Sequence, residues 1–444
     1  MAKLKHEIRD PIHGFIKVLQ DERKILDSKP IQRLRDIHQL GLTYLLYPSA
    51  THKRFEHSLG VMELATRVYD VITSPENILP TLKKELAELE DPDKLRYWRR
   101  VIRMAALCHD IGHLPFSHAV EKEVFPKGWD HERMTAQIIE DYLSKLFMEL
   151  TPPVRAKDVI KIALGPEKIS KIYPEIEFSP WETILSEIIV GDCFGVDRMD
   201  YLLRDSYHIG VAYGKFDHFR LIDTLRILPE PDTNEPKLGI EIGGIHVAES
   251  LLLARYFMYS QVYFHHVRRI YDYHLKDYLK IWLKEKCSSE FFPTKANDFL
   301  NYSDSVIMSD IQRSARESSV TGHKVAQRII NRKHYKLIYE LNPQDVEENP
   351  DALRVIYKSL AEKYGENKII IDEYEEKGGI LDFLVIDRNK QIFRARAVSD
   401  LLVKVPRVSI GLIFADREII EEARQWLEEN KLNILKRKEV IEDE

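Results

Sequence analysis

Histidine and aspartate are the residue types in this sequence that could bind a metal ion. Candidate ligands come from three separate helical patterns: the first carries His57, the second carries His109 and Asp110, and the third carries several aspartates from Asp197 onward. Imidazole and carboxylate ligands suit a divalent ion, and four of them leave positions open for water and a phosphate oxygen. Such an ion lowers the pKa of bound water and polarises a phosphoryl group. An adjacent His-Asp pair often arises by chance, so it is the pair together with the other candidate ligands that indicates a metal site.

The helical stretch that carries Asp197 presents further polar groups on the same side. Positions i+3, i+4, i+7 and i+8 from that residue are Asp200, Tyr201, Arg204 and Asp205. Residues at these intervals share one face of an α-helix. A pocket beside the first carboxylate would therefore also receive the others.

Helices must position these groups, and the chain from Pro30 to about Lys284 has a mostly helical pattern. Pro30 can open a helix as its first residue, and Asp130 suits an N-cap. Apolar residues recur at helical spacing in several stretches. The expected helices cover residues 54–73, 97–111, 130–147, 195–207 and 246–284.

Two other segments have different patterns. The charge-rich stretch Thr81–Arg100 contains Pro92, and we interpret it as a solvated helix pair or an insertion. The apolar runs Leu225–Leu228 and Leu238–Ile242 are separated by prolines, which predicts a short β-hairpin.

The C-terminal part of the chain changes character. Strands are expected over residues 335–341, 368–374, 380–386, 391–397 and 407–415, and amphipathic helices over 353–364 and 417–430. Such a mixture is typical of an α+β region. We therefore expect a mainly α protein, with a helical core over residues 1–325 and a smaller α+β region over 326–444.

Composition excludes several classes of protein. The chain has 444 residues, of which 66 are Lys or Arg and 72 are Asp or Glu, so its net charge of −6 does not indicate nucleic-acid binding. Cys108, Cys193 and Cys287 form no CxxC pair, which disfavours disulfide scaffolds and thiolate zinc sites. The N-terminus has no apolar signal segment, and no apolar run is long enough to span a membrane. We expect a cytoplasmic protein. Walker A, GxGxxG and HExxH motifs are also missing from the sequence.

An ordered series of motifs extends from about residue 5 to residue 285, far beyond one dipeptide. The motifs are Asp10-Pro11-Ile12-His13-Gly14, Gln32-Arg33-Leu34-Arg35, Gln39-Leu40-Gly41, Arg54-Phe55-Glu56-His57, His109-Asp110-Ile111-Gly112-His113, His131-Glu132 and Asp197-Arg198-Met199-Asp200-Tyr201. The series resembles the HD-domain phosphohydrolases, in particular their deoxynucleoside triphosphate (dNTP) triphosphohydrolase branch. The resemblance implies an HD-domain helical core and release of a deoxynucleoside and inorganic triphosphate from a dNTP.

The resemblance also implies roles for individual residues. It makes His57, His109, Asp110 and Asp197 the ligands of a divalent metal, with Mn, Fe, Mg, Ni, Co and Zn left open. Phosphate-binding or acid–base roles fall to His113, His118, His131 and Glu132. Glu121 stands where the family's relay has an aspartate, so its carboxylate reaches one methylene further. Helix capping or core packing is the structural alternative for His113 and His118.

A triphosphate is highly anionic, and by resemblance Arg54, Arg198 and Arg255 would bind it. An arginine fork can hold two phosphate oxygens, although each of these residues could instead form an ordinary salt bridge.

The deoxyribose pocket is implied in the same way. Gln39 and Asp205 match the contacts to the 3′-hydroxyl, Leu40 packs on the sugar, and Tyr201 falls in the pocket. Tyr263 matches a tyrosine that excludes the 2′-hydroxyl, but it also lies in an aromatic-rich helix that could be core.

Regulated members of the family bind a guanine nucleotide, GTP or dGTP, between the subunits of a homotetramer. Asp27, Gln32 and Arg35 match the residues that hold guanine, and Arg226 matches a phosphate contact of the neighbouring site. The carboxylate can accept from guanine N1 and N2, and the other side chains can donate. The alternative is that Asp27 caps the helix opened by Pro30 and that the other two are on its solvated face.

Three functions remain from the sequence. The first is a metal-dependent dNTP triphosphohydrolase, and the second is an HD phosphohydrolase for another nucleotide, such as a monophosphate, a cyclic dinucleotide or an alarmone. The third is a catalytically silent nucleotide-binding or nucleic-acid-binding protein, which the intact ligand set argues against. The sugar-pocket residues favour the first over the second.

Overall fold

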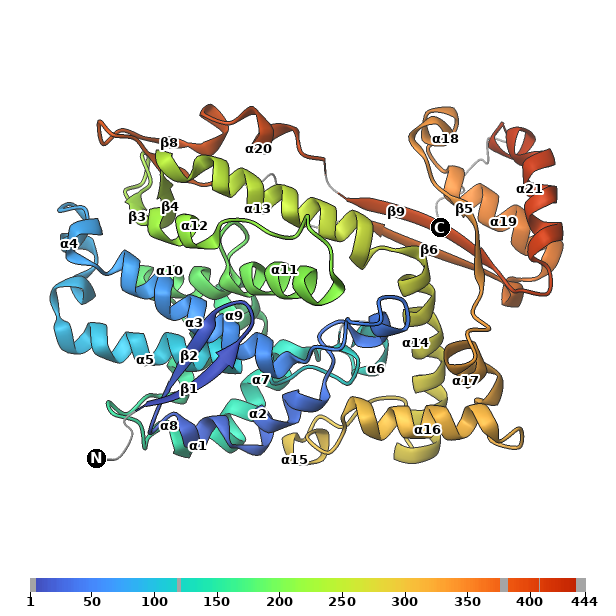
Figure 1. Cartoon of the computed structure of the whole chain (residues 1–444), viewed down its shortest axis with the longest axis horizontal. Helices are drawn as coiled ribbons and strands as arrows, with labels where there is room; N and C mark the ends of the chain where they lie inside the picture. The colour runs from blue at the N-terminus through green and yellow to red at the C-terminus, as the bar shows by residue number, and fades with distance from the viewer. Residues whose placement is uncertain (1–4, 118–120, 376–381, 407, 437–444) are drawn as a thin grey trace. The chain divides into compact units, whose positions relative to one another are not determined.

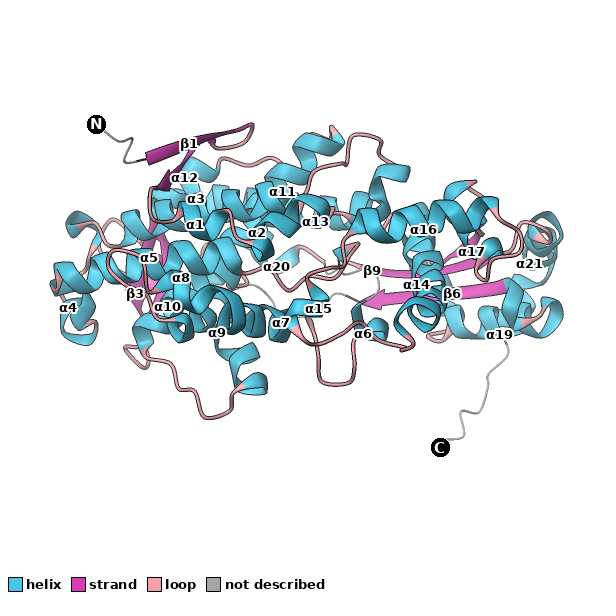
Figure 2. Cartoon of the chain, turned by 90° about the horizontal axis from the view of Figure 1, so that it is seen from below, coloured by secondary structure: helices cyan, strands magenta, loops and turns pink. Residues whose placement is uncertain are grey.

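We describe a computed structural model of the chain over residues 5–117, 121–375, 382–406 and 408–436. Helices dominate it and the sheets are small, so the expected mainly α class is confirmed (Figure 2). The chain forms two compact units that alternate along the sequence. One contains Met1–Met258, Phe291–Ile307 and Gly379–Val405, and the other contains Tyr259–Glu290, Met308–Gly378 and Pro406–Glu444.

The first unit holds most of the helices (Figure 1). They are α1 (Arg23–Leu26), α2 (Lys29–Arg33), α3 (Arg54–Ile72), α4 (Leu82–Glu85), α5 (Pro92–Cys108), α6 (Glu121–Val124), α7 (His131–Ile138), α8 (Ser144–Phe147), α9 (Ala156–Ile172), α10 (Pro180–Val190), α11 (Val196–Ile209), α12 (His218–Thr224), α13 (Ile245–Met258), α15 (Ala296–Phe299) and α20 (Asp400–Lys404). The helix α16 (Asp304–Arg316) begins in this unit and belongs to the second from Met308 onward.

The core of the first unit is formed by α3, α5, α9, α10 and α11, which pack against one another. Their buried faces carry many apolar side chains, of which Met62, Met104, Ile162 and Trp181 are completely buried, together with charged groups such as Arg103 and Asp200. Burial of such faces is what stabilises helices in water, because helix propensity alone is marginal.

Two glycines allow helices near the site to approach one another closely. A Cβ atom on Gly112, just after α5, would lie 2.1 Å from the backbone oxygen of His131 and 2.4 Å from the backbone nitrogen of Thr135. A Cβ atom on Gly60 in α3 would lie 1.9 Å from a carboxylate oxygen of Asp200 in α11. Only a hydrogen atom fits at these two points.

Six strands of the first unit form two small sheets. β1 (Lys5–Asp10) and β2 (Gly14–Leu19) make an antiparallel hairpin. β3 (Leu225–Pro229) and β4 (Pro236–Glu241) make a second one, as expected from the sequence. β7 (Leu384–Ile386) pairs with β4 in parallel and with β8 (Ile392–Arg394) in antiparallel, giving the order β3-β4-β7-β8.

The second unit contains a three-stranded antiparallel sheet in the order β5-β9-β6. Its strands are β5 (Lys336–Glu340), β6 (Ile369–Glu375) and β9 (Ser409–Ala415), and its helices are α14 (His266–Cys287), α17 (His323–Ile330), α18 (Pro343–Glu348), α19 (Ala352–Tyr364) and α21 (Ile420–Leu435). One core cluster joins α19 and α21 to this sheet through residues such as Ile356, Ile413 and Leu427. The strand expected within residues 407–415 is therefore present as β9 and forms part of this core.

Several expected helices differ from the structure at their ends. The helix expected over residues 97–111 begins at Pro92, because the Asp91 side chain accepts hydrogen bonds from the backbone nitrogens of Asp93 and Lys94. Pro92 therefore opens α5 and does not lie inside a helical element. The predicted N-cap Asp130 is confirmed by its hydrogen bond from the backbone nitrogen of Arg133.

The single helix expected over residues 130–147 is divided. It consists of α7, a π-helical turn over Ile139–Leu143 and α8. The one or two helices expected over 246–284 are two, α13 and α14, and a π-helical turn over Tyr259–Tyr263 separates them. The hairpin β1–β2 and the helices α9 and α10 were not anticipated.

The strands expected in the C-terminal region are present among the described residues, but they belong to different sheets. β5, β6 and β9 lie in the second unit, whereas β7 and β8 extend the hairpin sheet of the first. The expected boundary between residues 325 and 326 stays a prediction. None of the described helices is long and apolar enough to cross a membrane.

The close approach at Gly112 gives a test of the packing. Gly112→Ala should destabilise the protein by about 1–3 kcal/mol, because the added methyl group meets backbone atoms that cannot move aside cheaply. Gly243→Ala is the matched control, since its Cβ would meet only the tip of the Arg220 side chain. Urea denaturation of both variants measures the difference, and equal stabilities would contradict the packing argument.

Candidate active site

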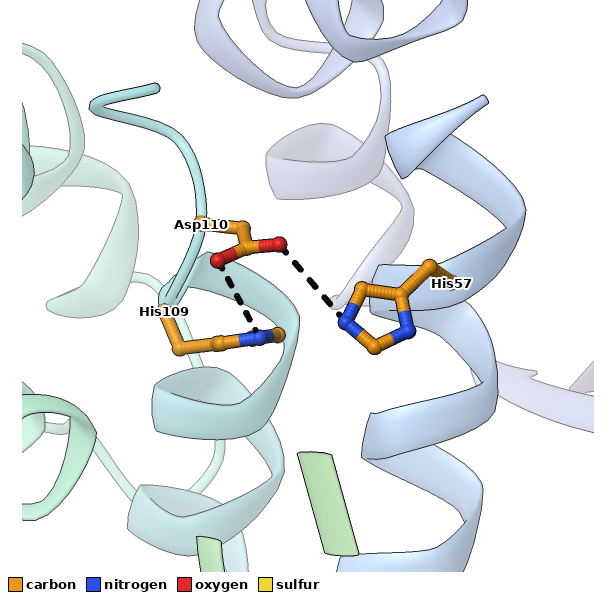
Figure 3. Close-up of side chains that lie close together, drawn as sticks. All are labelled: His57, His109 and Asp110. Carbon is orange, nitrogen blue, oxygen red and sulfur yellow. Dashed lines mark ion pairs between the residues drawn. The ribbon is translucent and has the colours of Figure 1, made fainter. Parts of the chain in front are cut away.

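Three helices bring the four predicted metal ligands together. His57 lies in α3, His109 and Asp110 follow α5 directly, and Asp197 is in the first turn of α11. Figure 3 shows the first three converging. His57 Nε2 lies 3.0 Å from Asp197 Oδ1 and 3.6 Å from Asp110 Oδ2, and His109 Nε2 lies 3.3 Å from Asp110 Oδ1 and 3.6 Å from Asp197 Oδ1.

These distances suit one shared ion. Donor atoms bound at about 2.1 Å to a single metal lie about 3 Å or more from one another. Both imidazoles also have their other nitrogen occupied: His57 Nδ1 donates to Asp200 Oδ2 at 2.8 Å, and His109 Nδ1 donates to the Ala106 carbonyl at 2.8 Å. Each Nε2 therefore faces the carboxylates, and His109 Nε2 is a buried atom without a hydrogen bond among the described residues. The residues present fit a divalent metal.

The electrostatics of this cluster favour positive charge at its centre. Burial opposes a charged imidazole, yet hydrogen bonds to Asp197 and Asp200 raise the pKa of His57 to about 10. Burial likewise opposes ionisation of Asp110, but Arg54 and then His109 hold the pKa of that carboxyl well below its usual range. A site that stabilises carboxylates and a cation together is a site prepared for a metal ion.

The loop after the ligands is held at several points. Arg33 donates to the His113 carbonyl at 2.9 Å, and Asp304 accepts from the backbone nitrogen of Phe116 at 2.7 Å. Phe116 and Ser117 both have left-handed backbones, with φ of 60° and 63°. Because non-glycine residues adopt that conformation only when their surroundings require it, these contacts fix the loop.

The loop also connects two predicted phosphate and acid–base residues to the ligands. Arg54 donates to the Ser117 hydroxyl at 2.9 Å and bonds to Asp110. His113 Nε2 lies 3.2 Å from Asp110 Oδ1. The predicted residue His118 lies outside the described residues.

His131 is the centre of a second charged group. Its Nδ1 donates to Glu121 Oε1 at 2.6 Å and lies 3.3 Å from Glu132 Oε2, and its ring stacks on that of His113 at 4.0 Å. Burial disfavours the imidazolium, but the Glu121 carboxylate outweighs burial and raises the pKa of His131 to about 9. Glu132 is also bonded to Lys168. The longer carboxylate at position 121 therefore does reach the histidine.

The residues predicted to bind the sugar are partly brought together. Asp205 Oδ1 accepts from His52 Nε2 at 2.7 Å, and the backbone nitrogen of Gln39 donates to the His52 carbonyl at 3.0 Å. The Oε1 atom of Gln39 is buried without a hydrogen-bond partner in the described part of the chain, and Leu40 beside it is buried. A ligand hydroxyl would satisfy such an oxygen.

The remaining predicted substrate residues are more dispersed. Arg198 and Arg255 line one small hollow, in which Arg198 lies 3.5 Å from an oxygen of Asp192. Tyr201 is half-buried on α11. Tyr263 lies in the second unit and is buried, and its ring is nearly perpendicular to that of Tyr259, with the two ring centroids 5.1 Å apart. Its role as a sugar gate stays a prediction.

Three of the four predicted regulatory residues are neighbours. Gln32 donates to the Leu26 carbonyl at 2.8 Å and accepts from Arg35 Nε at 2.9 Å, while Asp27 pairs with Arg23 at 2.7 Å. The alternative that Asp27 caps the next helix is wrong, because Ser28 occupies the N-cap position of α2.

The fourth regulatory candidate, Arg226, lies on β3. It pairs with Glu241 at 2.8 Å and donates to the carbonyl groups of Asp223 and Leu225. These contacts are all within the first unit.

Sequence reasoning left some site residues without a role. Asp200 and His13 were part of the motifs, yet only the structure shows that they support His57. No sequence pattern indicated the contacts of Lys168 and Asp304, because their partners Glu132 and Phe116 are 36 and 188 residues away in the chain.

The Glu121–His131 pair gives a prediction about protonation. His131 should carry a proton on both ring nitrogens at pH 7, and Glu121→Gln should return its pKa toward the ordinary value near 6.5. The pair stabilises the fold fully below pH 6.5, and this contribution disappears as pH rises through about 9. NMR titration of ¹³C-labelled histidines, assigned with His131→Gln, measures both values.

The control for that titration is Glu149→Gln, which changes an exposed carboxylate paired with Lys24. It should leave the His131 titration unchanged. A wild-type midpoint near 6.5 would show that the charge of Glu121 does not act on this ring.

Comparisons with known proteins agree with this geometry. Residues 54–170 match the HD domain and residues 216–410 match the HD associated region. An uncharacterized protein of Methanocaldococcus jannaschii is 32% identical over 98% of this chain and 84% of its own length. The deoxynucleoside triphosphate triphosphohydrolase SAMHD1 homolog of Dictyostelium discoideum is 29% identical over 80% of this chain and 63% of its own length.

A solved structure supports the same relationship. The crystal structure of a hypothetical protein from Aquifex aeolicus superposes with a TM-score of 0.74 at 32% identity, covering 95% of this chain and all of that one. The HD match begins at Arg54, the first residue of α3, and includes His57, His109 and Asp110. On these grounds, the chain belongs to the HD-domain protein family that includes the deoxynucleoside triphosphate triphosphohydrolases.

Proposed function

We propose that this protein is a metal-dependent triphosphohydrolase that converts a dNTP into a deoxynucleoside and inorganic triphosphate. The observation that carries the proposal is the convergence of two imidazole Nε2 atoms and two carboxylates, with each imidazole fixed by a hydrogen bond at Nδ1. Relatives named as dNTP triphosphohydrolases support the choice of substrate.

His57, His109, Asp110 and Asp197 would hold the ion. When bound, a divalent metal supplies a Lewis acid for a phosphate oxygen and makes water more acidic. The remaining chemistry belongs to side chains around it. Arg54 is a buried cation beside Asp110 and would bind a phosphate oxygen of the substrate.

His131 would supply a proton to the reaction. Its Nδ1 proton is held by Glu121, so the Nε2 proton of the imidazolium is the one that can move to a leaving-group oxygen. A pKa of about 9 keeps the ring charged at neutral pH, as a general acid requires. His113, stacked on that ring, would hold the pair in place.

The sugar would bind beside Gln39, Leu40 and Asp205. The buried oxygen of Gln39 and the carboxylate of Asp205 can both accept from a 3′-hydroxyl. Tyr201 and Tyr263 would contact the ribose, the latter against the 2′ position, and Arg198 and Arg255 would contact the triphosphate. The resemblance to the HD-domain family also implies that this protein forms a homotetramer.

The first test is direct incubation of the protein with each dNTP and Mn²⁺, followed by detection of released triphosphate. His109→Ala should lower this activity at least a hundredfold while the fold is retained, because one of four ligands is lost. His246→Ala is the matched control, since it removes an exposed imidazole paired only with Glu249 in the described contacts.

Other nucleotides in the same assay decide between the family's chemistries. Release of inorganic phosphate from a monophosphate, or opening of a cyclic dinucleotide or alarmone, with dNTPs intact, would replace the proposed substrate. Full activity in His109→Ala would refute the metal site itself.

Regulation is tested separately. We expect GTP or dGTP to raise the rate of dATP hydrolysis by about fivefold or more, because the nucleotide must bind the active state preferentially. Asp27→Ala should remove this effect and leave the basal rate, with Gln32, Arg35 and Arg226 as further contacts. A rate that does not change from micromolar to millimolar guanine nucleotide would contradict the proposal.

A further inference from the structure

Asp200 is a fully buried carboxylate that accepts four hydrogen bonds from three side chains. His13 Nε2 donates to Oδ1 at 2.6 Å, and His57 Nδ1 donates to Oδ2 at 2.8 Å. Arg204 donates to both oxygens, at 2.8 Å through Nε and at 2.9 Å through Nη2. Every lone pair in the plane of this carboxylate therefore has a donor, and one of the donors is a predicted metal ligand.

A second carboxylate fixes the donors in turn. Asp10, at the end of β1, accepts from Arg204 Nη1 at 2.9 Å. Its other oxygen accepts from the backbone nitrogens of Ile12 and His13, at 2.9 and 2.8 Å. The turn of the first hairpin, the face of α11 and the ligand-bearing helix α3 are thus joined through one buried chain of charges.

The fit between helix and carboxylate is very close. A Cβ atom at position 60 would lie 1.9 Å from Asp200 Oδ1 and 2.5 Å from Arg204 Nη2. Gly60 is one turn beyond His57 on α3, so the same helix both donates the hydrogen bond and makes room for its acceptor.

We propose that Asp200 is a positioning residue, which fixes the tautomer of His57 and presents its Nε2 to the metal. A proton held on Nδ1 leaves the Nε2 lone pair for coordination, and a carboxylate partner makes that nitrogen a stronger donor. His13, Arg204 and Asp10 hold the carboxylate so that it cannot turn away. This inference rests on the metal-binding part of the proposed function and does not depend on the substrate.

The two histidine ligands are therefore held by hydrogen bonds to different kinds of acceptor. His109 Nδ1 donates to a main-chain carbonyl, that of Ala106, which no substitution can remove. His57 depends on a side chain. Substitution of Asp200 should thus weaken one ligand selectively and leave the other intact.

A purely structural role is the alternative, and the same unit contains a matched example of it. Glu22 is also fully buried and accepts from Arg100 at 2.6 Å and from Arg103 at 2.8 and 2.7 Å. Among the described residues, none of the groups that donate to this carboxylate is a predicted metal ligand. Glu22→Gln and Asp200→Asn are therefore the same chemical change in two similar networks, only one of which reaches the site.

The experiment measures metal binding without any nucleotide. Mn²⁺ affinity is obtained by calorimetry on the full chain, and Co²⁺ is used as a spectroscopic probe of the coordination geometry. Asp200→Asn should weaken Mn²⁺ binding about 10–100-fold and change the visible Co²⁺ spectrum. Gly60→Ala keeps every charge but displaces the carboxylate, and it should do the same. Glu22→Gln should lower stability while affinity and spectrum stay as in the wild type.

Two results would overturn the proposal. One is unchanged affinity and spectrum in folded Asp200→Asn, and the other is an equal loss of affinity in Glu22→Gln. If the variants do not fold, NMR of the wild-type protein loaded with Zn²⁺ decides: the His57 proton must be on Nδ1, and a proton on Nε2 refutes the assignment. Hydrolysis of dNTPs plays no part in these readouts, so their failure and failure of the proposed substrate can be told apart.

Discussion

Burial of like charges beside one another is the constraint around which the first unit is built. Asp110 and Asp200 are buried carboxylates within one helical core, with the partly exposed Asp197 beside them, and buried carboxylates stay ionised only beside compensating cations. Arg54 and Arg204 supply that charge from fixed positions, and the imidazoles supply the rest. Helices α3 and α11 must hold these groups within a few tenths of an ångström, because a small displacement leaves a charge unpaired.

That requirement explains the backbone around the site. Helix α3 approaches Asp200 of α11 at Gly60, and the turn after α5 approaches the backbone of α7 at Gly112, and a Cβ atom would not fit at either point. Phe116 and Ser117 have a left-handed backbone, which is energetically unfavourable for residues other than glycine. Hydrogen bonds of this loop with Asp304, Arg33 and Arg54 hold it in that conformation. Strain and close packing occur together at the point where the chemistry needs rigid geometry.

Residues whose partners are specified by local pattern were predictable from the sequence. The apolar periodicity of α3 and the acidic cap at Asp130 were sufficient to predict where these helices begin. The family resemblance of the histidine and aspartate motifs predicted four metal ligands, and the structure brings these four residues close together. The contact of Asp304 with the Phe116 backbone could not be predicted, because the two residues are 188 positions apart in the sequence and meet only in the folded protein. The supporting role of Asp200 could not be predicted for a related reason. Helical spacing shows which face of the helix carries Asp200, but not which atom of another element this residue contacts.

The pairing of β7 with β4 has a consequence for how the protein is made. A ribosome delivers the chain from its N-terminus, yet the sheet of the first unit is completed by residues near position 390. Until they emerge, the outer edge of β4 has exposed backbone donors and acceptors, which invite pairing with other chains. The sheet of this unit is thus completed only after Tyr259–Glu290 and Met308–Gly378 of the second unit have left the exit tunnel.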